Sequence, residues 1–130
     1  MVKTLRYSRQ RERIYEYLIA TEEHPTAEMI HSDLRKESPE LSLGTVYRNL
    51  NRFREQGEII SVGTVRGVER FDGNTLPHVH FICNDCGAVL DLAEVKVPEE
   101  LSSAAARSAG GQVSSCQLSF TGICKNCNQE

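Results

Sequence analysis

The sequence predicts an α+β fold made of two small domains. Three segments with apolar residues at helical spacing occupy residues 9–56, and two short strand patterns follow them. The second half contains further short strand patterns and two Cys-x-x-Cys pairs. A chain of 130 residues is long enough for two small domains, each with a thin core. A structural metal would therefore add stability.

The first expected helix begins near Arg9, with Ser8 as its N-cap. Ile14 and Leu18 lie on one face of it at helical spacing. The helix ends before Pro25, because a proline disfavours helical backbone at the residue before it.

Two further helices are expected before the strands. Thr26 can cap the second helix, which ends at residues 38–39, a Ser-Pro pair. His31, on this helix, is expected to face solvent. Ser42 can cap the third helix, which is closed by Gly57.

The third expected helix has one polar face. When its apolar residues Val46 and Leu50 are buried, the step of about 100° per residue turns the opposite face outward. Tyrosine, arginine and asparagine on one face suit contacts with phosphates and base edges of DNA. The expected DNA contacts on this helix are Thr45, Tyr47, Arg48, Asn51 and Arg52.

Residues 58–64 and 68–71 are expected to form a β-hairpin around the Arg66-Gly67 pair. Three short helices followed by a hairpin are typical of a winged helix-turn-helix. Arg9 and Arg11, in a basic N-terminal segment, are further expected DNA contacts. The same pattern fits any small α+β domain with a solvated helix face, because a fold does not fix a function.

Turn-forming residues at 74–77 are expected to be a hinge between two domains, 1–73 and 78–130. The expected elements after the hinge are strands at 78–82, 88–92 and 113–121, and a helix at 99–109. Alternation along a strand places His78 and His80 on one face.

The last expected strand carries the fifth cysteine. Alternation places Cys116 on one face with Leu118 and Phe120. We therefore expect Cys116 to be a small, buried apolar residue.

The other four cysteines give the strongest chemical signal. Each Cys-x-x-Cys knuckle lets two thiolates reach one ion, and two knuckles complete the tetrahedral site that structural zinc prefers. A redox dithiol is the alternative, but a thioredoxin-like motif needs a βαβ setting that the sequence does not show. The expected Zn²⁺ ligands are Cys83, Cys86, Cys124 and Cys127.

A second set of metal-ligand side chains lies around the first cysteine pair. Its members are Asp72, His78, His80 and Asp91. Their nitrogen and oxygen donors suit Fe²⁺, Mn²⁺ or Zn²⁺. Spacing alone leaves two interpretations open, a metal site and two structural histidines near carboxylates. Nothing local marks His24 as a ligand.

Composition limits the partners. The net charge is −3, and residues 1–72 carry 12 basic and 12 acidic residues, so a globally basic nucleic-acid binder is excluded but a local basic patch is not. No apolar run approaches the ~20 residues of a membrane span, and no signal-peptide segment is visible at the start. We expect a cytoplasmic protein with no membrane partner, in which paired cysteines bind metal.

Together these motifs resemble the ferric uptake regulator (Fur) superfamily. The segments that carry the resemblance are residues 8–11, 24–27, 43–50, 70–72 and 78–80, together with both cysteine pairs. Members are dimeric bacterial repressors with an N-terminal winged helix and a C-terminal α/β dimerisation domain. The resemblance implies a homodimer that binds a double-stranded DNA operator and is not an enzyme.

Within the superfamily the chain is most similar to the peroxide-stress repressors (PerR), in which three histidines and two aspartates hold Fe²⁺ or Mn²⁺. The resemblance implies that the regulatory ligands are His24, Asp72, His78, His80 and Asp91, and that His24 and His78 are oxidation-sensitive. Iron-responsive members usually carry glutamate where Asp91 stands.

The implied mechanism is that one ion joins the two domains. Peroxide reacts at bound Fe²⁺, a histidine ligand is modified, and metal and DNA are released. The chain departs from its relatives at residues 113–116. This segment lacks the histidine that many relatives carry in this strand. An additional metal site there is not expected.

Three alternatives differ in kind. The first is an iron- or manganese-responsive Fur-type repressor that senses metal concentration. The second is an enzyme with a hydrolytic metal site, although a five-ligand set leaves no open position for water or substrate. The third is a zinc-stabilised DNA-binding module whose histidines and aspartates are incidental.

Overall fold

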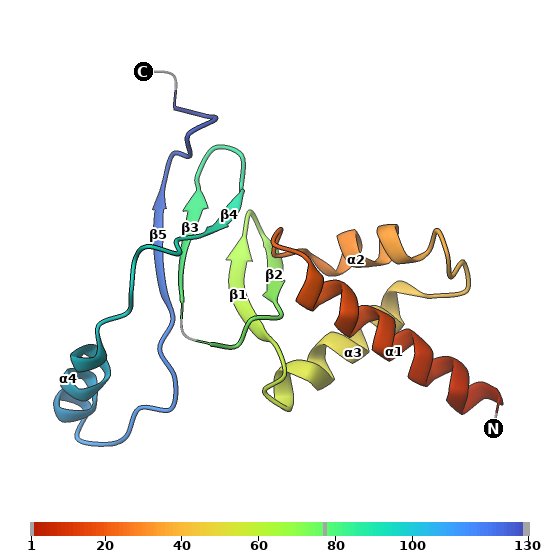
Figure 1. Ribbon diagram of the computed structural model, residues 1–130, viewed down its shortest axis with the longest axis horizontal. Coiled ribbons are helices and arrows are strands. Elements are labelled where there is room, and N and C mark those ends of the chain that lie inside the picture. Colours follow the sequence, from red (N-terminus) through yellow and green to blue (C-terminus); the bar gives the residue numbers. More distant parts are fainter. Residues whose placement is uncertain (1, 77, 129–130) are drawn as a thin grey trace. The chain divides into compact units, whose positions relative to one another are not determined.

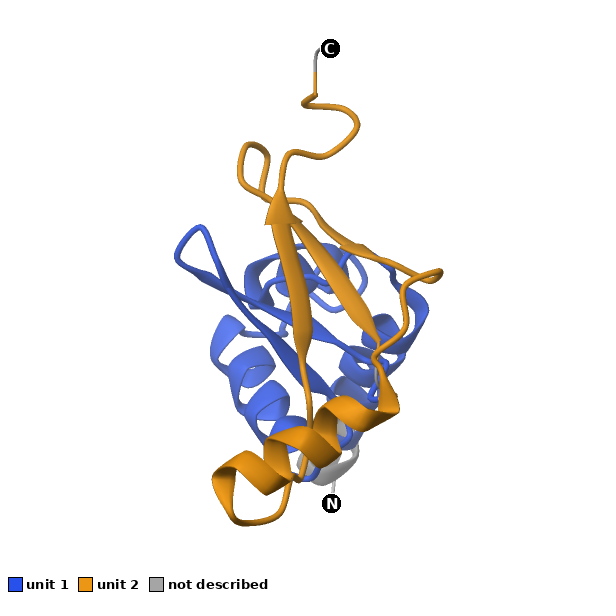
Figure 2. Ribbon diagram, turned by 90° about the vertical axis from the view of Figure 1, so that its left-hand side faces the viewer, with its two compact units in different colours: residues 1–75 blue, residues 76–130 orange. Residues whose placement is uncertain are grey.

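The computed structural model describes residues 2–76 and 78–128 (Figure 1). The chain divides into two compact units, Met1–Thr75 and Leu76–Glu130 (Figure 2). Each unit has its own sheet, one of two strands and one of three. Within the described ranges, no helix has the length and apolar character needed to cross a membrane.

The first unit has three helices followed by a hairpin, in the predicted order. Its elements are α1 (Val2–Ala20), α2 (Ala27–Leu34), α3 (Leu43–Glu55), β1 (Ile60–Val65) and β2 (Val68–Asp72). The buried side chains of all three helices and the hairpin form one core. It consists of Ile14, Leu18, Ala27, Ile30, Leu41, Val46, Leu50, Phe53, Ile59 and Phe71.

Local capping explains two of the three helix starts. Oγ1 of Thr26 accepts a hydrogen bond from the backbone N–H of Met29, and Oγ of Ser42 accepts one from the N–H of Thr45, both at 3.1 Å. These two caps are confirmed. The prediction that Ser8 caps the first helix is wrong, because α1 begins at Val2. Residues 2–8 contain neither glycine nor proline to stop the helix.

The hairpin is confirmed. β1 and β2 pair in antiparallel fashion, with Val65 opposite Val68. The two turn residues, Arg66 and Gly67, have φ of 55° and 80°, as a two-residue type I′ turn requires. Gly73, the residue after β2, lies against the backbone of α1. A side chain would not fit there, since a Cβ added to Gly73 would lie 2.9 Å from the carbonyl oxygen of Leu18.

The second unit is a three-stranded sheet with one helix. Its elements are β3 (Val79–Cys83), β4 (Val89–Asp91), α4 (Glu99–Ala109) and β5 (Leu118–Gly122). The strand order is β4-β3-β5, with β4 antiparallel and β5 parallel to β3. α4 has the predicted bounds and ends at Gly110, whose backbone is left-handed at φ 70°.

The prediction for the last strand is partly wrong. β5 begins at Leu118, so Cys116 lies in the segment before it and is only half-buried. Phe120 is 47% exposed. β5 is an edge strand that pairs with β3 on one side. Cys116 is thus not the buried apolar residue that strand alternation predicted.

The second unit has a thin core. In its described part, the buried apolar side chains are Val79, Cys83, Val89 and Cys124, and α4 contributes none. Two of these four side chains are thiols. Packing alone supplies little stability to so small a core, which leaves a role for a metal crosslink.

Candidate metal centres and nucleic-acid interface

The four paired cysteines lie at one end of the three-stranded sheet. Cys83 ends β3, and Cys124 follows β5 by two residues. Because β3 and β5 are parallel neighbours, with Cys83 opposite Gly122, the two knuckles meet at the same end (Figure 1). Sulfur atoms of Cys83, Cys86, Cys124 and Cys127 all lie within 4.8 Å of one another.

This sulfur geometry fits zinc. Sγ of Cys86 lies 3.8 Å from Sγ of Cys124. Thiolates about 2.3 Å from a tetrahedral Zn²⁺ are about 3.8 Å apart. Each knuckle is closed by a backbone hydrogen bond, from Gly87 N to Cys83 O at 3.0 Å and from Cys127 N to Cys124 O at 3.1 Å.

The pKa values of two of the four thiols, Cys83 and Cys127, are shifted in opposite directions. Backbone N–H groups of Cys86 and then Cys124 lower the pKa of the Cys83 thiol to about 6. Hydrogen bonds with the side chains of Cys124 and Cys86 raise the pKa of Cys127 to about 12. Four thiolates this close together repel one another unless a cation lies among them. The arrangement therefore favours a bound thiophilic cation.

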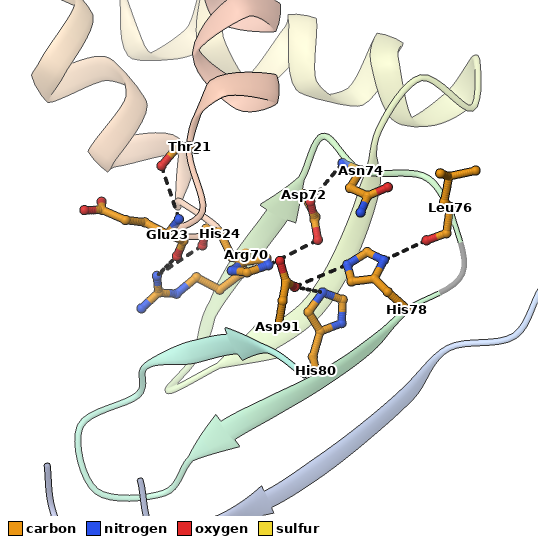
Figure 3. Close-up of polar contacts among 10 residues, drawn as sticks. All are labelled: Thr21, Glu23, His24, Arg70, Asp72, Asn74, Leu76, His78, His80 and Asp91. Atoms are coloured by element: carbon orange, nitrogen blue, oxygen red, sulfur yellow. Dashed lines mark hydrogen bonds and ion pairs between the residues drawn. The ribbon is translucent and has the colours of Figure 1, made fainter. Parts of the chain in front are cut away.

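A pair of nitrogen and oxygen donors lies in the first unit. Nε2 of His24 is 3.2 Å from Oδ2 of Asp72, and both side chains are buried (Figure 3). The other carboxylate oxygen of Asp72 accepts a hydrogen bond from the backbone N–H of Asn74 at 2.9 Å. His24 has a left-handed backbone, with φ of 54°. Such strain in a non-glycine residue often accompanies function.

A second group of donors lies in the second unit. Nε2 of His78 and Nε2 of His80 are each 3.3 Å from Oδ1 of Asp91 (Figure 3). Antiparallel pairing places His80 directly opposite Asp91. Nδ1 of His78 lies 2.7 Å from the carbonyl oxygen of Leu76 and donates to it, which leaves Nε2 as the ligand atom. The two histidines thus share one face, as predicted, although His78 lies just before β3.

Within each group, the donor atoms are as far apart as neighbouring ligands of a metal ion. Donors about 2.0–2.2 Å from a metal and at right angles to each other are about 3 Å apart. The observed separations of 3.2 and 3.3 Å agree with this. Imidazole and carboxylate donors fit Fe²⁺, Mn²⁺ or Zn²⁺.

Four of the five predicted contacts on α3 face solvent. Tyr47, Arg48, Asn51 and Arg52 are exposed. The prediction that Thr45 points outward is wrong, since it is 8% exposed. Thr45 is the third residue of α3, and its hydroxyl folds back to lie 2.9 Å from Oγ of the Ser42 cap. It also accepts a hydrogen bond from Nη2 of Arg48 at 3.0 Å, so it orients that arginine.

A groove of about 480 Å³ runs between α1 and α3. Its lining residues are Tyr7, Arg11, Thr45, Arg48, Asn49 and Arg52. Three arginines line it, which suits a polyanion. Arg9 is exposed on α1 but does not line the groove. Sequence reasoning missed Tyr7, although its spacing of four residues from Arg11 places both on one face of a helix.

Two further expectations concern isolated polar residues. The prediction that His31 faces solvent is wrong, because it is half-buried and its Nε2 lies 2.8 Å from the carbonyl oxygen of Leu41. This contact ties α2 to the segment just before α3. Asp85 lies inside the first Cys-x-x-Cys pair, where the sequence predicts a solvated turn residue, and it is exposed.

Comparison with known proteins gives one family. The sequence model of the ferric uptake regulator family matches residues 2–121. The peroxide operon regulator of Bacillus subtilis (strain 168) is 36% identical over 126 residues, which cover 97% of this chain and 86% of that protein. The peroxide-responsive repressor PerR of Staphylococcus epidermidis is 32% identical, with 97% and 83% covered.

A solved structure shares the fold. The peroxide stress regulator of Campylobacter jejuni superposes with a TM-score of 0.80 at 28% identity. The match covers 95% of this chain and 92% of that one. The winged helix followed by a small α/β half is thus a known architecture.

Proposed function

The chain belongs to the ferric uptake regulator family, and from this premise we propose that it is a metal-dependent transcriptional repressor that senses peroxide. It binds a double-stranded DNA operator as a homodimer while a regulatory Fe²⁺ or Mn²⁺ is bound. Oxidation of histidine ligands ends repression. The observation that carries this proposal is the pair of donor groups with ligand spacing, one in each unit.

We propose that one regulatory ion takes its ligands from both units. His24 and Asp72 supply two donors, and the second unit supplies three from His78, His80 and Asp91. Neither group alone fills the coordination sphere of Fe²⁺ or Mn²⁺. Asp72 and His78 are six residues apart, so the chain between them spans at most about 22 Å. A shared ion is therefore compatible with the connection.

A shared ion would bias the orientation of the two units. Only a state in which all five side chains reach the ion gains their full binding energy. In a dimer, that orientation sets the distance between the two copies of α3, which must match successive major-groove half-sites. The exposed α3 residues and the arginine-lined groove are the surface proposed to meet DNA.

The four-cysteine site has a different role. Its thiolates hold Zn²⁺ permanently and crosslink β3 to the segment after β5. This crosslink completes the thin core of the second unit. The unit can then present His78, His80 and Asp91 to the regulatory ion.

The proposal of peroxide sensing rests on the imidazole and carboxylate donors, which suit Fe²⁺, and on the identity of residue 91 as an aspartate. Bound Fe²⁺ would supply the electron that cleaves the oxygen–oxygen bond of hydrogen peroxide. His24 and His78 are proposed to gain an oxygen atom, after which they hold the metal poorly. Mn²⁺ at the same site would support DNA binding without this sensitivity. Iron-responsive relatives usually carry glutamate at the position of Asp91, so an aspartate here favours peroxide sensing.

The test compares operator binding by the zinc-loaded dimer with added Fe²⁺ or Mn²⁺, before and after peroxide. We expect either metal to promote DNA binding, and peroxide to abolish it only in the iron-loaded protein. Peptide mass spectrometry should find one added oxygen on His24 or His78 in that sample and not in the manganese-loaded control.

The Asp91→Glu variant is the matched comparison, because it keeps the charge and moves the carboxylate by one methylene. We expect it to keep metal-dependent DNA binding and to oxidise more slowly. A wild-type protein whose histidines stay unmodified and whose operator binding survives peroxide would be a metal-concentration sensor instead. An operator affinity that is the same with and without either metal would contradict the proposed regulatory site.

A further inference from the structure

We propose that Arg70 is a positioning residue that holds His24 in the conformation needed for the regulatory metal. This inference rests on the proposed function, because His24 is a proposed ligand. Sequence motifs did not single out Arg70 for any role of its own. The contacts that support the proposal join it to Glu23, His24 and Met29, which all belong to the first unit (Figure 3).

Arg70 contacts the turn that carries His24. Its Nη1 donates to the backbone carbonyl of His24 at 3.1 Å and to that of Glu23 at 3.4 Å. The same nitrogen lies 3.8 Å from Sδ of Met29 on α2. One guanidinium thus binds two successive carbonyls of the turn between α1 and α2.

The turn needs such support. His24 has φ of 54°, a left-handed backbone that a residue with a Cβ adopts only when its surroundings hold it there. Its imidazole is 2% exposed, so its direction is fixed by the backbone that carries it. Loss of the carbonyl contacts would let the backbone of His24 relax towards an ordinary φ and turn the imidazole away from Asp72.

Three successive residues of β2 bind this turn. The side chain of Arg70 holds the carbonyl of His24, and the backbone N–H of Phe71 donates to the carbonyl of Pro25 at 3.0 Å. The carboxylate of Asp72 lies 3.2 Å from the His24 ring. Arg70 and Asp72 are two residues apart and so lie on one face of the strand. One strand therefore positions both the ligand His24 and its neighbouring ligand Asp72.

The positive charge of Arg70 makes the proposal testable, because two explanations predict opposite changes in metal affinity when Arg70 is replaced. A guanidinium near a cation site repels the cation, so removal of its charge alone would tighten metal binding. Removal of a positioning contact would weaken it instead, since partners that orient metal ligands are typically worth about 10- to 100-fold in affinity. The two explanations therefore predict opposite changes.

The experiment measures Mn²⁺ affinity of the zinc-loaded dimer by isothermal titration calorimetry for wild type, Arg70→Met, Arg70→Lys and Arg66→Met. We expect Arg70→Met to bind Mn²⁺ about 10- to 100-fold more weakly. Arg70→Lys, which keeps a cationic donor, should recover most of the loss. Arg66→Met removes the same charge from the exposed tip of the same hairpin and should bind like wild type.

Operator binding gives a second readout. If Arg70 only positions His24, saturating Mn²⁺ restores DNA binding by Arg70→Met, and the midpoint of the metal titration shifts by the same factor as the calorimetric affinity. Zinc content and circular dichroism should match wild type. If Arg70→Met does not fold, Arg70→Gln, which also removes the charge and is too short to hold both carbonyls, replaces it, and the direction of its change in Mn²⁺ affinity decides in the same way.

Two failures are distinguishable. Unchanged or tighter Mn²⁺ binding by Arg70→Met, with wild type still metal-dependent, overturns the role of Arg70 alone. A wild-type protein that does not bind Mn²⁺ outside its cysteine site overturns the proposed function and this inference with it.

Discussion

The phenol oxygen of Tyr47 donates a hydrogen bond of 2.8 Å to Oε1 of Glu28, and so joins α3 to α2 on the face proposed to meet DNA. This bond raises the pKa of Tyr47, because ionisation would remove the donor and place two negative charges together. A carboxylate thus lies beside an expected DNA contact. It orients the tyrosine but repels phosphates.

We expect Glu28→Gln to strengthen operator binding about 1.4- to fivefold, since an exposed charge contributes about 0.2–1 kcal/mol. Glutamine keeps an oxygen acceptor for Tyr47 and removes only the charge. Fluorescence anisotropy with labelled operator at several salt concentrations measures the gain, which should shrink as salt rises. Glu22→Gln, on an exposed turn residue, is the charge-matched control. Equal affinities of Glu28→Gln and wild type at low salt would contradict the prediction.

A second tyrosine links stability to pH. Burial and then a hydrogen bond to the Asp33 carboxylate raise the pKa of Tyr17 above the ordinary tyrosine range. We expect Tyr17→Phe to lower the free energy of unfolding by about 0.5–1.5 kcal/mol at neutral pH. A raised folded-state pKa means that this stabilisation is complete below the unfolded pKa of about 10 and is lost as pH rises through the folded value.

Urea unfolding followed by circular dichroism checks this at pH 7 and at points above about 10, the ordinary tyrosine pKa. Wild type and Tyr17→Phe should converge as the pH rises. Asp33→Asn keeps an acceptor near the hydroxyl and should remove part of the pH dependence. A difference between wild type and Tyr17→Phe that stays constant with pH would count against the assigned hydrogen bond.

The orientation of Asn51 limits what it can recognise. Nη2 of Arg54 donates to Oδ1 of Asn51 at 2.7 Å, while Nη1 of Arg54 lies 2.6 Å from Oε2 of Glu69. One of the two lone pairs of the amide oxygen is therefore used and Arg54 lies beside it, so we expect the amide nitrogen to be the group that meets DNA. Asn51 should act as a donor to phosphates or base acceptors, without the two-atom contact that asparagine makes with adenine.

We expect Asn51→Asp to weaken operator binding by about 1–3 kcal/mol without loss of stability. The substitution keeps the acceptor for Arg54 but replaces the outward donor with a carboxylate oxygen. Anisotropy gives the affinity, and urea unfolding gives the stability. Asn128→Asp, remote from α3 in the sequence, is the matched control. Normal operator affinity in Asn51→Asp would remove Asn51 from the interface.

Local sequence signals predicted much of this molecule, and the main exception, His24, depends on tertiary contacts. The caps Thr26 and Ser42 act within three residues, so composition and spacing were enough to place them. The two Cys-x-x-Cys pairs could likewise be recognised from their spacing along the chain. His24 carries no such signal from spacing, because its burial and its contact with Asp72 depend on β2, nearly fifty residues later. The resemblance to a family, and not periodicity, singled it out.

Two wrong predictions come from the use of periodicity alone. The helical wheel placed Thr45 on the outer face, but a hydroxyl near a helix start bonds back to the cap, here Ser42. Strand alternation placed Cys116 in a buried face, but the strand begins two residues later and lies at the sheet edge. Periodicity assigns a face to each residue. It does not report which faces another element covers.

The last prediction concerns the four-cysteine site. Structural zinc in small peptides contributes about 10–16 kcal/mol, whereas a whole domain has a net stability of about 5–15 kcal/mol. The buried apolar side chains in the described part of the second unit include two of the ligands themselves. We therefore expect Cys86→Ser, or chelation of zinc, to unfold residues 78–128 and to leave α1, α2 and α3 folded.

Hydrogen–deuterium exchange separates the two units in one experiment. Protection should be lost in β3, β4 and β5 and retained in the helices of the first unit, and far-ultraviolet circular dichroism should show only a partial loss of structure. Cys116→Ser is the matched control, because Cys116 lies outside the four-sulfur cluster and its substitution should leave zinc content and exchange unchanged. Unchanged protection of β3 after complete zinc removal would show that the sheet is stable without the metal, and that the thin core is sufficient by itself.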